Sequence, residues 1–123
     1  MPVVELNEVV LQDFPGGATY QTLVGDADGT TPVRIGLQVS PPGYSTGTHS
    51  HPYLEVITVL AGECDAWIGD EPLAHLATGS TMILPPHVPH GFRATGDDPL
   101  KTYGVHVSGE RIVHRPESEP PTC

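Results

Sequence analysis

Two histidines and a glutamate stand close together in the middle of the sequence, at a spacing that suits metal binding. His49, His51 and Glu55 are two and four residues apart, and in an extended chain such even spacing places all three side chains on one face. At about 3.3 Å per residue, Glu55 would lie roughly 13 Å beyond His51 in a straight strand, too far for one shared ion. We therefore expect a bend at Pro52, which fixes its own φ and cannot donate to a sheet, with Glu55 on the next strand.

A fourth ligand candidate follows a proline-rich turn. The segment 85–90 (PPHVPH) ends one predicted strand and delivers His90 into the next. Any one histidine is more often an ordinary surface or core residue, but four ligand-type residues bracketed by glycines favour a shared site. Three imidazoles and one carboxylate suit Fe(II), Mn(II), Ni(II), Cu(II) or Zn(II), and an octahedral ion held this way keeps open positions. The sequence thus indicates one divalent transition metal ion as cofactor, in a catalytic kind of site.

The elements that position these residues are predicted to be short strands. Val33, Ile35, Leu37 and Val39 alternate with other residues, which is typical of a half-buried strand. Turn residues bound the other predicted strands, at 54–60, 63–68, 80–84, 90–94 and 100–107, with a weaker one near 18–24. A strand about every ten residues is typical of an antiparallel sandwich or barrel. The fold class is therefore all-β.

Charge and segment lengths exclude several kinds of partner. Fifteen acidic residues against five basic ones give a net charge of −10, the wrong sign for nucleic acid or an anionic membrane surface. No apolar stretch approaches the roughly 18 residues of a spanning helix, and the N-terminus lacks the basic start of a secretory signal. We expect a cytoplasmic protein in which Cys64 and Cys123 are reduced thiols.

The glycines around the first three ligands complete a known pattern. Gly43-x5-His49-x-His51-x3-Glu55-x6-Gly62 resembles the first motif of the cupin superfamily, with every fixed position filled. That motif is highly specific. The resemblance covers residues 33–108, and the chain is identified as a small single-domain, metal-binding cupin of the cupin_2 type.

The second cupin motif, G-x5-P-x-G-x2-H-x3-N, is met in part. Gly79, Pro85 and His90 occupy its positions, whereas His87 replaces the second glycine and Ala94 the asparagine. Both positions vary widely in cupins. The two motifs together imply an antiparallel jelly-roll (double-stranded β-helix) barrel that binds a metal through His49, His51, Glu55 and His90.

The resemblance also implies a domain organisation. We expect one barrel domain over residues 1–114, with its core at 33–108, and a flexible tail over 115–123, which is rich in proline and glutamate. Small jelly rolls leave apolar faces and sheet edges outside, and a two-fold related copy is their commonest cover. A homodimer is therefore predicted.

Two further histidines are candidate catalytic residues. His87 is expected at the rim of the barrel, where an imidazole could act as acid or base near neutral pH. His106 shares a strand face with Gly104 and Ser108, while Tyr103, Val105 and Val107 occupy the other face. We expect the apolar set to point to a core, and the pattern leaves open whether His106 faces the pocket. Candidate pocket residues are Gln38, Tyr53, Phe92 and Tyr103.

The resemblance implies a metal-dependent enzyme that acts on a small organic molecule. A non-haem Fe(II) dioxygenase is favoured, in which substrate chelates the metal and O2 takes the remaining site. The first alternative is an isomerase, cyclase or lyase that uses the metal as a Lewis acid. The second is a metal-containing binding module without turnover. Substrate and native metal stay open.

Overall fold

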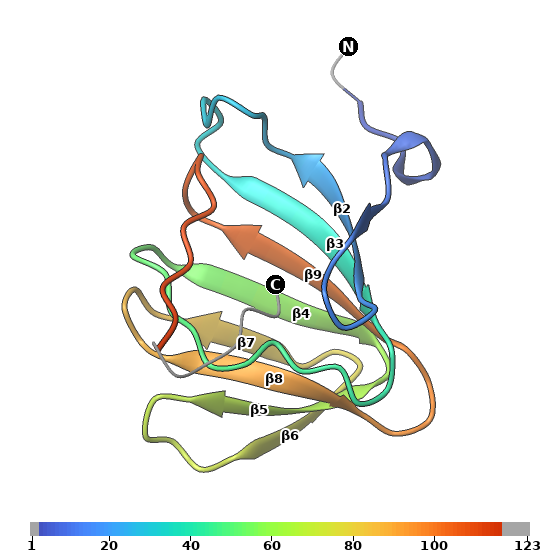
Figure 1. Cartoon of the computed structure of the whole chain (residues 1–123), viewed down its shortest axis with the longest axis vertical. Coiled ribbons are helices and arrows are strands. Elements are labelled where there is room, and N and C mark those ends of the chain that lie inside the picture. The colour runs from blue at the N-terminus through green and yellow to red at the C-terminus, as the bar shows by residue number, and fades with distance from the viewer. Residues whose placement is uncertain (1–2, 117–123) are drawn as a thin grey trace.

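Two antiparallel sheets pack against each other in the computed structural model, which describes residues 3–116 (Figure 1). One sheet has six strands in the order β1-β2-β3-β9-β4-β7, and the other has three in the order β6-β5-β8. The strands are β1 (Gln12–Asp13), β2 (Thr19–Val24), β3 (Arg34–Ser40), β4 (Glu55–Ala61), β5 (Glu63–Ile68), β6 (Ala74–Ala77), β7 (Thr81–Leu84), β8 (His90–Thr95) and β9 (Leu100–His106). A short 3-10 helix, η1 (Leu6–Glu8), precedes them. This arrangement confirms the jelly-roll barrel.

Each strand predicted from the sequence is present, and two others were missed. Strand β1 has only two residues, and β6 has the sequence AHLA. Alanine and histidine carry little β propensity, so β6 forms because it pairs with β5 and not because of its own residues.

Of the predicted tail, residues 117–123 lie outside the described part of the chain. Arg115 donates a hydrogen bond to the Thr46 carbonyl oxygen at 2.8 Å.

A glycine of the first motif makes the tight connection from β4 to β5. Gly62 has φ +80°, and a Cβ at this position would lie 2.6 Å from the Pro99 carbonyl oxygen. Both the left-handed backbone and the close approach of the Pro99–Leu100 backbone require glycine here. The same turn lets β4 and β5 enter different sheets, and it therefore helps to close the barrel.

The interior is divided into an apolar part and a polar part. The apolar core is built by β4, β5, β7, β8 and the start of β9, with neighbouring loops; its buried members are Ala18, Tyr44, Ile57, Val59, Cys64, Ala66, Met82, Leu84, Phe92, Ala94 and Leu100. Cys64 is a free thiol, as predicted; it is also fully buried, and burial raises the pKa of its thiol to about 11. The polar part lies over the inner faces of β3 and β9.

The expectation that the apolar residues of β9 point to a core was wrong. Thr102, Gly104 and His106 line the interior pocket, so the alternating Tyr103 and Val105 lie on the outer face of the sheet. The physical reason is that this part of the barrel encloses a polar pocket, which needs small and polar residues inside.

Within residues 3–116, no helix has the length and apolar character needed to cross a membrane.

Candidate metal centre

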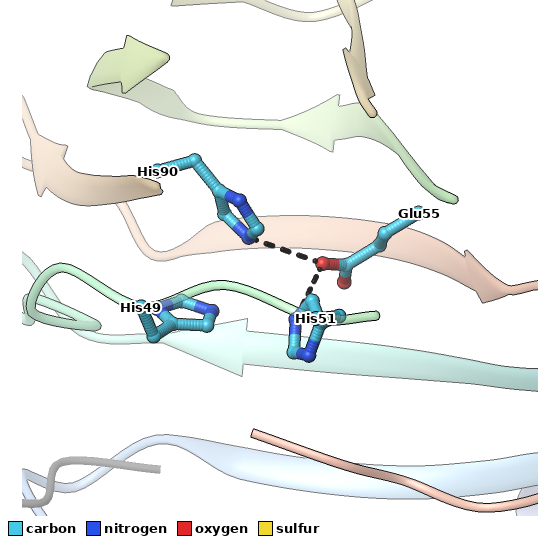
Figure 2. A group of neighbouring side chains, drawn as sticks. All are labelled: His49, His51, Glu55 and His90. Atoms are coloured by element: carbon cyan, nitrogen blue, oxygen red, sulfur yellow. Dashed lines mark ion pairs between the residues drawn. The ribbon is translucent and has the colours of Figure 1, made fainter. Parts of the chain in front are cut away.

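The four predicted ligands converge from three parts of the fold. His49 and His51 lie on the loop before β4, Glu55 is the first residue of β4, and His90 is the first residue of β8. The backbones of His49 and His90 exchange two hydrogen bonds, of 2.9 and 2.8 Å. One ligand atom from each of the four side chains lies within 4.8 Å of the others, and all four residues are buried. Figure 2 shows the Glu55 carboxylate between the rings of His90 and His51. The bend expected at Pro52 is present, since residues 51–54 lie outside any strand.

Three of the histidines are held in one tautomer by backbone carbonyl groups. Nδ1 of His49 lies 3.1 Å from the Gly47 oxygen, Nδ1 of His51 lies 2.6 Å from the Ile112 oxygen, and Nδ1 of His90 lies 2.9 Å from the Val88 oxygen. A carbonyl oxygen only accepts, so each Nδ1 carries the hydrogen and each Nε2 keeps its lone pair in the neutral ring. This is the arrangement by which metal-ligating histidines are commonly oriented.

The atoms that face one another in the centre lack hydrogen-bond partners. His51 Nε2, Glu55 Oε1 and His90 Nε2 are buried and unsatisfied, although Glu55 Oε1 lies 3.0 Å from His51 Nε2 and 3.4 Å from His90 Nε2. Lone pairs and a carboxylate facing each other in a buried place are unfavourable unless a cation lies between them. The donor set and its orphaned atoms therefore fit a divalent transition metal ion.

The protonation states at neutral pH also fit this centre. Burial lowers the pKa of His49 to about 3, and the neighbouring His90 lowers it as well, so the His49 ring is neutral. Burial raises the pKa of the Glu55 carboxyl, but the hydrogen bond with His106 opposes burial, and the pKa lies well below the usual range. Glu55 is therefore ionised.

His106 faces this centre, but its ring is held the other way round. Its Nε2 lies 3.0 Å from Glu55 Oε2, and its Nδ1 lies 2.7 Å from the Tyr53 hydroxyl. The ionised Glu55 carboxylate only accepts, so the neutral His106 ring has its hydrogen on Nε2, and its Nδ1 accepts from the Tyr53 hydroxyl, which lies farther, 3.5 Å, from its other acceptor, the Ile112 carbonyl oxygen. His106 thus carries its hydrogen on Nε2 and donates it to Glu55. The question that the sequence left open is answered in favour of the pocket.

The other predicted site residues divide into three groups. Gln38 and Phe92 line the pocket with the four ligands and His106. Tyr53 lies behind the pocket wall, where its ring stacks on His51 at 5.1 Å between centroids. Tyr103 lies on the outer face, and His87 is exposed in a turn with φ +67°, outside the pocket lining. A catalytic part for His87 stays a prediction.

Sequence reasoning missed one whole side of the pocket. Phe14, Tyr20 and Arg111 line it from the two ends of the chain, far from either motif. The Phe14 and Tyr20 rings stack at 5.2 Å, and Arg111 Cζ lies 5.6 Å from the Phe14 ring centroid. No local pattern marks such residues, because only the pairing of β2 with β3 brings the N-terminal segment over the pocket.

An antiparallel barrel with a buried centre of three imidazoles and one carboxylate defines a class of β-barrel protein with a candidate metal site. The Cupin_2 family model, described as a cupin domain, matches residues 36–107. The chain belongs to this cupin family.

Known proteins that resemble this chain include two curated relatives. Protein SchB of Streptomyces halstedii is 33% identical over 96 residues, which are 77% of this chain and 69% of SchB. H2HPP isomerase of Bacillus subtilis is 30% identical over 82 residues, which are 67% of this chain but 32% of the isomerase. The chain therefore spans about a third of the isomerase's length. Among solved structures, the polyketide cyclase RemF from Streptomyces resistomycificus has a TM-score of 0.77 at 24% identity, over 94% of this chain and 84% of RemF. That likeness concerns the fold.

Proposed function

We propose that this cupin is a metal-dependent enzyme that acts on a small organic molecule and moves a proton on it, as an isomerase or cyclase does. The observation that carries the proposal is the set of orphaned buried atoms, His51 Nε2, Glu55 Oε1 and His90 Nε2, which face one another beside a pocket. His49, His51, Glu55 and His90 would hold one divalent ion. When bound, that ion polarises a carbonyl oxygen as a Lewis acid.

The part proposed for the chain's own residues is orientation and proton handling. His106 lines the pocket and has its hydrogen on Nε2, hydrogen-bonded to Glu55 Oε2. It keeps the second carboxylate oxygen engaged, so that Oε1 is the atom offered to the centre. Tyr53 fixes this tautomer through its 2.7 Å hydrogen bond. In this role, His106 is the residue best placed to hold a proton next to a bound ligand.

Two comparisons support the isomerase or cyclase reading over the others. One relative is described as an isomerase and is 30% identical to this chain over 82 residues. A protein with the same fold is described as a polyketide cyclase. Proton transfer beside a carbonyl group also matches a pocket in which a histidine N–H lies close to the proposed metal ligands.

The second candidate is the non-haem Fe(II) dioxygenase suggested by the cupin resemblance. The observation in its favour is the donor set, since three imidazoles and one carboxylate suit Fe(II) and leave coordination positions open. The two candidates differ in their need for oxygen and for a redox-active metal. Zn(II) has no redox chemistry, whereas it is an effective Lewis acid.

The deciding experiment compares Fe-loaded and Zn-loaded protein, each with and without air, on a panel of diketones, hydroxyaryl ketones, catechols and flavonols. Proton-transfer chemistry predicts turnover with both metals in the absence of oxygen. Turnover that requires both iron and air would contradict the isomerase or cyclase proposal and support the dioxygenase. No turnover in any arm, with metal bound, would favour the binding module.

A further inference from the structure

The pocket carries a second recognition feature besides the four ligands. Arg111 lines the pocket, and within residues 3–116 its guanidinium forms no ion pair. It lies over the Phe14 ring, which in turn stacks on Tyr20. The sequence has only five basic residues against fifteen acidic ones. A positive side chain in the lining of the pocket therefore has the opposite sign to the net charge of the molecule.

The charge inside the pocket favours an anion. Glu55 is the one acidic residue of the lining and Arg111 the one arginine or lysine. A divalent ion on the four ligands would outweigh the single negative charge of Glu55, and Arg111 would add another positive charge. A net positive, partly enclosed site in an otherwise acidic protein attracts a negatively charged ligand.

The shape of the pocket favours a flat ligand. Gly36 of β3 and Gly104 of β9 are paired across the strands and both line the pocket, so this strip of the sheet carries no side chain of its own. The Tyr20 hydroxyl lies where a Cβ on Gly36 would be. Beside Gly104 the space is open, since a Cβ there would meet only Ile57, at 3.8 Å. The rings of Phe14, Tyr20 and Phe92 form further walls, and aromatic walls stack well on planar ligands.

We propose that Arg111, the Phe14–Tyr20 stack and the Gly104 strip form a recognition site for a planar, conjugated oxyanion, such as an aromatic enolate, phenolate or carboxylate. The proposal rests on the proposed function in that it names the substrate class of the same pocket. The anionic group lies toward Arg111, and the flat body lies along the glycine strip toward the ligand cluster. A guanidinium is well suited to this task because it both stacks on aromatic faces and binds oxyanions.

The test uses three probes that differ in one property at a time. Naphthalene-2-sulfonate is planar and anionic, naphthalene-2-sulfonamide is planar and neutral, and decahydronaphthalene-2-sulfonate is anionic and not planar. Affinities are measured by isothermal titration calorimetry with the zinc-loaded full chain. We expect naphthalene-2-sulfonate to bind about tenfold or more tightly than either comparison probe, since hydrogen bonds to a charged group are the strong ones.

Variants then assign the preference to residues. Arg111→Gln should weaken naphthalene-2-sulfonate binding about tenfold and leave the sulfonamide unchanged. Arg93→Gln is the matched control, since Arg93 is exposed on β8 and lies outside the pocket lining. Gly104→Val should weaken both planar probes, because it fills the strip without a positive φ or a close backbone contact to strain the fold.

Two results would overturn the inference: equal affinity for the three probes, or Arg111→Gln behaving like Arg93→Gln. Repeating the titrations on EDTA-treated protein separates this inference from the proposed function. If no metal binds but the loss in Arg111→Gln persists, the metal proposal fails and the recognition site stands. If metal binds but the probes are not distinguished, the recognition site fails alone.

Discussion

The Tyr53 hydroxyl lies 2.7 Å from Nδ1 of His106, and this contact sets which nitrogen of His106 faces Glu55. The same phenol ring stacks on His51. One side chain behind the pocket wall therefore orients two imidazoles, and its hydroxyl can be removed without losing its ring.

Tyr53→Phe should lower the metal affinity about tenfold, because hydrogen bonds that orient the groups around a metal centre contribute at that level. The His106 ring should lose its preference for the Nε2–H tautomer, which 15N NMR of the imidazole nitrogens reports. Tyr103→Phe is the matched control, since Tyr103 lies on the outer face of β9. Unchanged affinity and tautomer in Tyr53→Phe would show that Tyr53 does not position the site.

The buried His49 should make the metal-free protein less stable as the pH falls. Burial and His90 lower its pKa to about 3 in the folded state, against 6.5 for the unfolded chain. Between these values the unfolded chain binds more protons, so the free energy of unfolding decreases as pH decreases, by up to about 1.4 kcal/mol per pH unit. Denaturant titrations in EDTA between pH 7.5 and 5 should show a shallower dependence for His49→Gln.

His75 provides a control of opposite sign. Asp65 and Glu63 raise the pKa of this exposed histidine by hydrogen bonding, so its contribution to stability is lost as pH rises through the folded-state pKa. His75→Gln should therefore make the dependence on pH steeper. A His49→Gln variant with the same pH dependence as the wild type would contradict a neutral, buried His49.

His87→Gly should stabilise the fold by about 1 kcal/mol. His87 has φ +67°, where a side chain is strained and glycine is not. This geometry also explains why the second cupin motif has glycine at that position. Thermal or denaturant unfolding checks the sign. His75→Gly, within strand β6, should instead destabilise, and a loss of stability in both variants would mean that His87 makes a contact that outweighs its strain.

A second copy of the chain is expected to cover the outer face of the six-stranded sheet, where Ile35, Val56 and Val105 lie half-buried and Ile83 is 64% exposed. Light scattering should give about twice the chain mass of 13.0 kDa. Val105→Lys should shift the protein toward monomer, whereas Leu73→Lys, at an exposed position between β5 and β6, should not. A wild-type mass of one chain at micromolar concentration would refute the dimer.

The parts that the sequence predicted well are those that depend on local order. The even spacing of His49 and His51, the proline bend and the glycine at position 62 act within a few residues and could be predicted from them. The convergence of His90, which pairs with the distant His49, was implied by the resemblance to the two cupin motifs. The contributions of Tyr53, Tyr20 and Arg111 depend on contacts between distant segments. The Tyr53–His106 contact, for example, spans 53 positions.

Periodicity also misled where a pocket takes the place of a core. On β9 the larger apolar side chains were expected inside, whereas Gly104 and His106 are the inward residues. Alternation identifies two faces of a strand, but it assigns the inner face only when the interior is apolar.

Metal stoichiometry tests the central claim most directly. EDTA-treated protein is dialysed against limiting Zn(II) in chelator-free buffer, and bound metal is measured by elemental analysis for the wild type, His51→Ala and the control His75→Ala, whose exposed imidazole lies outside the centre. We predict one ion per chain for the wild type and His75→Ala, and well under half for a folded His51→Ala, because that variant removes one of four converging donors. A wild type that binds no ion, or a His51→Ala variant that binds as much as His75→Ala, would contradict a metal centre built on His49, His51, Glu55 and His90.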